Sequence, residues 1–80
     1  MSVRRLANPR GVCVRTDGSG TPAAIQGVSV ESVIEEWVVE DRWWSAQPVR
    51  RRYFELVLAG GRNVVVFKEV MSRSWFEQRG

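Results

Sequence analysis

The sequence predicts an all-β domain, a small antiparallel meander rolled into a barrel of about six strands. Three observations predict this class: short runs of β-branched and aromatic residues, turn residues at regular intervals between them, and a glycine pair flanked by two apolar runs. The chain has 80 residues, of which 44% are hydrophobic and 26% charged, so it has room for one domain of ordinary globular composition. We expect residues 1–10 to form a flexible basic N-terminal arm and residues 11–80 to form the single β domain.

The first predicted element is a hairpin near the N-terminus. Residues 11–16 are short and β-branched, and they run into the polar, glycine-rich stretch 17–20. Gly18 and Gly20 tolerate a positive φ, which favours a turn there. Residues 22–26 then resume an extended segment, which completes the hairpin.

Residues 28–40 fit two templates. Apolar residues recur from Val30 to Val38 at helical spacing, and Ser29 is a candidate helix cap. Against a helix, valine and isoleucine fill about half of these positions, and both are stiff at χ1. We therefore predict an extended segment, either two short strands or one bulged strand.

The clearest local signal is a second hairpin. Residues 50–59 and 62–70 flank Gly60 and Gly61, a pair that suits a two-residue type I′ turn. The register that follows from this turn places Phe54–Phe67, Leu56–Val65 and Leu58–Asn63 on one face, and Arg52 opposite Glu69.

The remaining elements are a loop over residues 41–48, a turn over 71–74 and a final strand over 75–78. Alternation along the strands defines the predicted core, which consists of Val12, Val14, Ile25, Trp37, Phe54, Leu56, Leu58, Val65, Phe67 and one of Trp75 or Phe76.

Catalysis and metal binding find little support in the sequence. The chain has no histidine, and Cys13 is its single cysteine, so neither a nucleophile–base pair nor a zinc site can be assembled. The adjacent acidic pairs 35–36 and 40–41 point to opposite faces of a strand, which suits a solvated edge that discourages aggregation. We predict that the protein is not an enzyme and has no cofactor.

The basic residues suggest one binding function. Eleven arginines accompany the single lysine, Lys68, and the net charge is +3, which indicates either a surface for polyanions or the codon usage of a GC-rich genome. Within the run 50–54, Arg51 and Tyr53 share one face and Arg50 and Arg52 the other. Arginines beside exposed aromatic rings are typical of single-stranded nucleic-acid platforms. The alternative is a solvated strand start whose arginines pair with Glu69, Glu40 or Asp41.

The tryptophans suggest another binding function. Trp37 and Trp75 are expected in the core, whereas Trp43 and Trp44 are adjacent and cannot both point inward on an extended backbone. One of this pair is therefore a candidate anchor for a partner protein or a base. In the alternative arrangement, one ring packs inward and the other lies over the barrel edge.

The sequence also indicates a compartment. Residues 1–8 lack the apolar region of a signal peptide, and no apolar run approaches the roughly 20 residues that span a bilayer. Cys13 has no partner for an intramolecular disulfide. We expect a cytoplasmic protein without a membrane partner, and the sequence leaves its oligomeric state open.

The second half of the chain, residues 25–79, resembles a family of small bacterial domains of unknown function. The residues that carry the resemblance are Trp37, Trp43-Trp44, Pro48, Arg51-Arg52-Tyr53-Phe54, Gly61 and Trp75-Phe76-Glu77-Gln78. The family is similar to the C-terminal tail of inactive Y-family polymerase-like proteins of a bacterial damage-tolerance cassette. The resemblance implies a β fold and a DNA-repair context. This chain departs from the pattern at residues 72–74, where a glycine usually precedes the last aromatic pair, and it lacks a polymerase portion.

Together these observations predict a non-catalytic accessory module that binds single-stranded nucleic acid, or a DNA-repair protein, in a damage-tolerance context. The alternative is a protein–protein interaction module that uses exposed tryptophans. Nucleic-acid binding predicts one continuous basic patch beside Trp43 or Tyr53, whereas protein binding predicts exposed aromatic residues flanked by acidic ones. The candidate binding residues are Arg50, Arg51, Arg62, Trp43, Trp44 and Tyr53.

Overall fold

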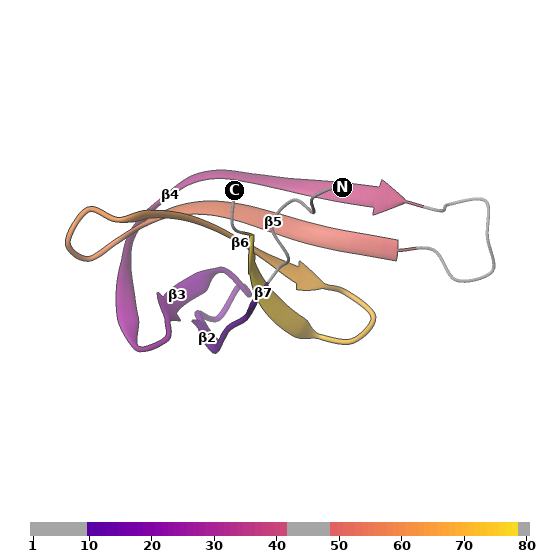
Figure 1. The fold of residues 1–80 in the computed structure, drawn as a ribbon, viewed down its shortest axis with the longest axis horizontal. Helices are drawn as coiled ribbons and strands as arrows, with labels where there is room; N and C mark the ends of the chain where they lie inside the picture. Colours follow the sequence, from indigo (N-terminus) through magenta and orange to yellow (C-terminus); the bar gives the residue numbers. More distant parts are fainter. Residues whose placement is uncertain (1–9, 42–48, 79–80) are drawn as a thin grey trace, which may run out of the picture.

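The computed structural model, which describes residues 10–41 and 49–78, is an antiparallel all-β sheet (Figure 1). Its strands follow the order β1-β7-β6-β5-β4-β3-β2. The strands are β1 (Arg10–Gly11), β2 (Val14–Thr16), β3 (Pro22–Ile25), β4 (Val28–Asp41), β5 (Val49–Leu58), β6 (Asn63–Glu69) and β7 (Ser74–Gln78). The all-β prediction is confirmed. Arg10, which the sequence assigned to the N-terminal arm, lies in β1.

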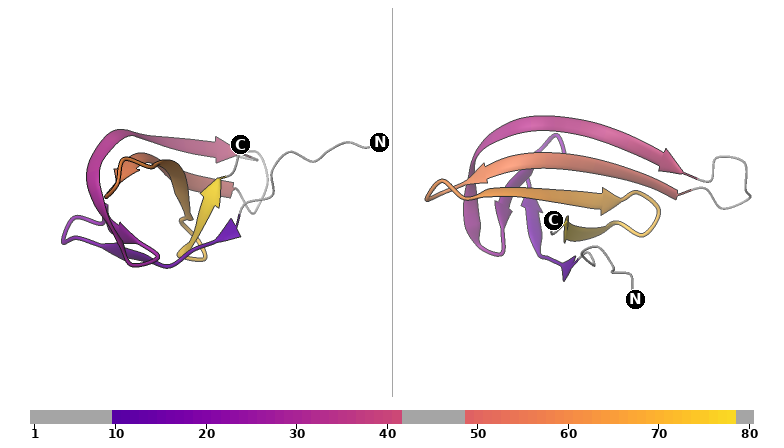
Figure 2. Two further views of the ribbon diagram at one scale, coloured as in Figure 1. Left: turned by 60° about the vertical axis from the view of Figure 1, so that its left-hand side comes forward. Right: turned by 45° about the horizontal axis from the view of Figure 1, so that its top comes forward.

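The sheet curls into a half-barrel whose two edge strands are neighbours in the chain (Figure 2). β1 pairs with β7, and β2 pairs with β3. Between β1 and β2, the Val12 N–H donates to the Trp75 carbonyl at 3.1 Å, and the Gln26 N–H donates to the Cys13 carbonyl at 2.8 Å. Residues 10–16 therefore bridge the two edges of the sheet.

The predicted turn between β2 and β3 is present, with a positive φ at Gly20 but not at Gly18, and it is built around Asp17. One Asp17 carboxylate oxygen accepts hydrogen bonds from the Ser19 N–H at 2.8 Å and the Thr21 N–H at 3.0 Å, and from the Ser19 hydroxyl at 2.9 Å. The hydrogen bond from the Ser19 hydroxyl, followed by those from the two backbone amides, holds the pKa of Asp17 below its ordinary value. The ionised carboxylate thus closes the hairpin loop.

β4 is one long strand with two bulges, so the bulged-strand alternative is confirmed and the helix is not formed. Its register against β5 shifts between Val30 and Ser32 and again between Val33 and Glu35. Each bulge adds one residue, bends the strand and moves the next side chain back to the inner face. Val30, Val33 and Glu36 accordingly lie opposite Leu58, Leu56 and Phe54. The three-residue steps of β4 match the two-residue steps of β5, which explains the helix-like spacing in the sequence.

The register predicted for the β5–β6 hairpin is wrong by one residue. The Gly61 N–H donates to the Leu58 carbonyl at 2.8 Å across a turn whose third residue, Gly60, has φ +94°. A positive φ at the third residue alone is typical of a type II turn, whereas type I′ also needs a positive φ at the second residue, and Ala59 does not have one. Gly61, with φ +88°, then adds a residue before Leu58 pairs with Arg62. The type I′ geometry occurs instead between β3 and β4, where Gln26 and Gly27 have φ +51° and +82°.

The slip moves every side chain of β6 to the other face. Tyr53, not Phe54, lies opposite Phe67, and Arg51, not Arg52, lies opposite Glu69. The slip places Val65 on the outer face, so the prediction that it belongs to the core is wrong. The same prediction for Trp37 is wrong because Trp37 of β4 lies opposite Tyr53 on the outer face. Phe67 is part of the buried core as predicted, although it lies on the outer face.

The core lies inside the curl of the sheet. Phe54, Leu56 and Val66 are fully buried at its centre. The buried cluster comprises Ile25, Phe54, Leu56, Leu58, Val64 and Val66, with Val12, Val14, Val30 and Trp75 packed against it. The predicted inward residues of β5 are thus correct, and on β6 the inward residues are Val64 and Val66.

Candidate interaction surface

A row of four aromatic rings crosses the outer face of the sheet. Trp37 of β4, Tyr53 of β5, Phe67 of β6 and Phe76 of β7 lie directly opposite one another in the pairing register. Successive ring centroids are 5.3, 5.0 and 5.3 Å apart, and the Trp37 and Tyr53 planes are within 7° of parallel. Stacked cross-strand rings stabilise a sheet, so we define these four residues as the aromatic row.

The row is open at its Trp37 end. Within the row, each ring packs against the rings next to it, so the ring faces between neighbours are occupied. Trp37 ends the row on β4, and β3 pairs with β4 only at Val28 and Ser29. Among residues 10–41 and 49–78, no strand lies beyond Trp37 on that side of the sheet.

Arg51 is fixed against the aromatic row. Its guanidinium lies 4.8 Å from the Phe67 ring centroid, and its Nη2 is 3.3 Å from a carboxylate oxygen of Glu69. The adjacent Tyr53 side chain is the main reason that the pKa of Arg51 lies above its ordinary value. The Arg51 side chain is therefore held by contacts within the outer face of the sheet, and a phosphate would have to compete with these contacts.

The other arginines of the run point to the opposite face and are also paired. Arg50 Nε is 3.1 Å from a Glu40 carboxylate oxygen, and both side chains are more than half exposed. Arg52 Nε donates to Glu36 at 2.6 Å. The predicted alternative, in which arginines of this run pair with Glu69 and Glu40, is thus observed for Arg51 and Arg50. Arg52 pairs with Glu36 and not with Glu69.

Arg62 lies at the other end of the β5–β6 hairpin. Its Nη2 is 3.4 Å from Glu77, which also has Arg10 at 3.8 Å. Glu77 is only 8% exposed, and it connects β7 to β1 and to the hairpin turn. Sequence reasoning missed this role, because alternation places Glu77 on the inner face but does not reveal its partners.

The six predicted binding residues are therefore not assembled into one patch. Arg51 and Tyr53 are neighbours on the outer face, Arg50 is on the inner face, and Arg62 lies at the far end of its hairpin. Trp43 and Trp44 lie outside the residues that the structure describes.

Among the strands that the structure describes, the long side of β4 is a free edge. Within them, β4 pairs only with β5 from Val30 to Asp41, and in Figure 1 it borders the described sheet along most of its length. An unpaired edge presents backbone N–H and C=O groups to any extended chain. Four apolar side chains of this stretch are 40–52% exposed, namely Val33, Ile34, Val38 and Val39.

The same edge is acidic. β4 contains five acidic residues and no basic one, and Glu35 lies directly opposite Glu55. The described part of the chain holds eight basic and nine acidic residues, because Arg4, Arg5, Arg42 and Arg79 lie outside it. The described residues thus do not carry the positive net charge of the sequence.

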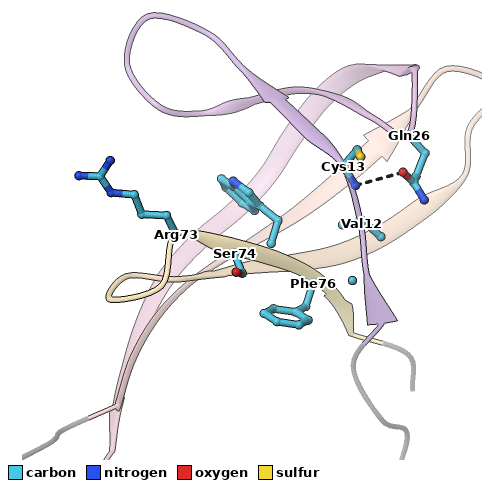
Figure 3. A pocket seen from close by; sticks show the side chains of 8 residues that line it. Val12, Cys13, Gln26, Arg73, Ser74 and Phe76 are labelled. Atoms are coloured by element: carbon cyan, nitrogen blue, oxygen red, sulfur yellow. Dashed lines mark hydrogen bonds between the residues drawn. The ribbon is translucent and has the colours of Figure 1, made fainter.

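A shallow pocket of about 540 Å³ lies between β7 and the segment that joins β1 to β2 (Figure 3). Arg73, Trp75 and Cys13 line it, and the Gln26 side-chain oxygen accepts a hydrogen bond from the Cys13 N–H at 3.0 Å. No base accompanies the thiol in this lining, so the pocket lacks a nucleophile–base arrangement.

Two further features are absent from the described residues. They contain no group of three or more side chains arranged to hold a metal ion. Within residues 10–41 and 49–78 there is also no helix of the length and apolarity needed to cross a bilayer. Compared with known protein families, curated proteins and solved structures, the chain matches none.

Proposed function

We propose that this domain is a non-catalytic protein-interaction module that binds an extended segment of a partner along the free edge of β4. The observation that carries the proposal is this edge, which is unpaired among the described strands from Val30 onward and exposes apolar side chains. Strand addition uses such edges, with affinity from main-chain hydrogen bonds and specificity from alternate side chains.

Several features of β4 suit this role. Charges and bulges protect an edge strand, and β4 has both, but β4 is also long and exposes Val38 and Val39 on its two faces. The segment from Glu35 to Asp41 pairs with β5 without a register shift, so it offers a regular stretch of backbone. Both bulges lie before it.

Single-stranded nucleic-acid binding is the second candidate function. The observation that favours it is Arg51 beside Tyr53 on the outer face. Against it, the three arginines of the run are paired with carboxylates, and Arg50 and Arg51 lie on opposite faces. The resemblance to damage-tolerance proteins supports a DNA-repair context for either function, with a repair protein as the proposed partner of the β4 edge.

Fluorescence anisotropy with two kinds of labelled probe separates these functions. The first probe is a nine-residue peptide of alternating threonine and valine, made also in two versions that are N-methylated at odd or at even positions. We expect the plain peptide to bind and one methylated version to lose binding, because only alternate N–H groups face β4. The second probe is a thymidine oligonucleotide.

The outcomes have distinct meanings. Peptide binding that survives both methylation patterns would contradict strand addition. Oligonucleotide binding without peptide binding would favour the nucleic-acid module. In that case Arg51→Ala should make the log–log salt dependence shallower by about 0.7, the value for one phosphate contact to a single strand. Arg50→Ala, a change of the same charge on the other face, is the matched control.

A further inference from the structure

We infer that the segment bound by β4 is basic at one defined position, next to Glu35, and apolar at the two following alternate positions. This inference rests on the proposed function, and it specifies the partner by its chemistry. The relevant residues share the outer face, where Glu35, Trp37 and Val39 succeed one another along β4. An added strand would place its own alternate side chains beside them.

The preference for a cation comes from a pair of like charges. Glu35 and Glu55 lie directly opposite each other on the outer face. Like charges in this position destabilise a sheet, and neither carboxylate has an ion-pair partner among residues 10–41 and 49–78. A lysine or arginine of the added strand at this level would relieve the repulsion.

The neighbouring positions favour apolar side chains. Trp37 is the open end of the aromatic row, so an apolar or aromatic side chain of the partner would extend the stack. Val39 follows on the same face, and it lies opposite Arg51, which would repel a second cation. The outer face therefore selects the order basic, apolar, apolar at alternate positions.

On its inner face, β4 has a weaker preference for the charge of the partner's side chains. Glu36 and Glu40 of β4 are already paired with Arg52 and Arg50 of β5. A second copy of this chain is a poor occupant, because pairing β4 with another β4 would bring two acidic strands together. The fitting partner is an extended segment with lysine or arginine on the face that meets Glu35.

The test compares labelled peptides that have threonine at odd positions, valine at two successive even positions, and arginine, glutamine or glutamate at the next even position beside them. Each of the three is made in both sequence orders, because an added strand can run parallel or antiparallel to β4. We expect the arginine peptide to bind about threefold to tenfold more tightly than the glutamine peptide, and the glutamate peptide to bind most weakly. In the double variant E35Q/E55Q the three affinities should converge to within about twofold. Glu31→Gln, a change of the same type on the same strand, should leave the preference in place.

The outcomes separate this inference from the proposal beneath it. Equal binding of all three peptides, with one methylation pattern still abolishing it, would overturn the basic preference and leave strand addition intact. An arginine preference that persists in E35Q/E55Q would overturn the assignment to Glu35 and Glu55. Failure of every peptide to bind at millimolar concentration would overturn both the inference and the proposed function.

Discussion

Replacement of Leu56 by alanine tests the core that the structure defines. Leu56 is fully buried in the middle of β5, with Val33 of β4 and Val64 of β6 as its cross-strand neighbours. Truncating such a side chain removes its transfer free energy and leaves a cavity, which costs about 2–5 kcal/mol. A domain of this size has a total stability of roughly 4–12 kcal/mol, so the variant should lose a large part of it.

The assay is urea denaturation followed by far-ultraviolet circular dichroism. For a small domain, a loss of this size lowers the urea midpoint by on the order of 2 M, with an unchanged slope. Val38→Ala, at a half-exposed position of β4, is the control and should cost about 1 kcal/mol or less. A Leu56→Ala midpoint close to that of the parent would refute the assignment of the Leu56 side chain to the inner face of the sheet.

Three further predictions concern the turns and the register. Gly60→Ala should destabilise the protein by about 1–2 kcal/mol, because Gly60 has φ +94°. Gly18→Ala, at a position with open space and no positive φ, should be neutral or slightly stabilising. Thermal denaturation compares the two variants, and equal effects would contradict the hairpin geometry. A double-mutant cycle with Tyr53→Leu and Phe67→Leu should yield a coupling of about 0.5–1.5 kcal/mol, and strict additivity would contradict the observed register. The pKa of Asp17 is lowered in the folded state, so its contribution to stability is full above the ordinary value of about 3.9 and is lost as the pH falls through the lowered one. Denaturation of the parent and of Asp17→Asn from pH 7 to pH 2 should show the stability difference shrinking only at the acidic end, and a difference independent of pH would contradict this role.

The elements of the fold were predictable because they depend on local signals. Gly18 and Gly20 mark the first turn, and the alternation of Phe54, Leu56 and Leu58 identifies the buried face of β5. These features need only the backbone preferences of glycine and the two-residue period of a strand. The sequence therefore predicts the class of the fold and the inner face of its central strand.

The register was not predictable, because it depends on which residues form the centre of the turn, Ala59-Gly60 or Gly60-Gly61. Gly60-Gly61 suits both a two-residue type I′ turn and a type II turn with an extra residue, and the two choices differ by one position in β6. That difference decides whether Phe67 faces the core or joins Tyr53 on the outer face. It also decides which arginine meets Glu69.

The candidate site was predictable only in part. The alternation of Arg50, Arg51 and Tyr53 between faces follows from the strand itself, and the structure agrees with it. The ion pairs with Glu36 and Glu40 and the free edge depend on how β4 lies beside β5 and on where β3 ends. These are tertiary relations between segments distant in the chain, and charge patterns alone do not specify them.

Backbone hydrogen exchange of the peptide complex tests the central claim most directly. The chain is incubated in deuterated buffer with and without a saturating concentration of the arginine-containing peptide, and amide exchange is followed by nuclear magnetic resonance. The account predicts that protection increases at alternate amides between Val30 and Asp41, where β4 has no second neighbour among the described strands, and stays unchanged in β1 and β7. Protection confined to β1 and β7, or to the start of β5 around Arg50 and Arg51, would contradict binding at the β4 edge.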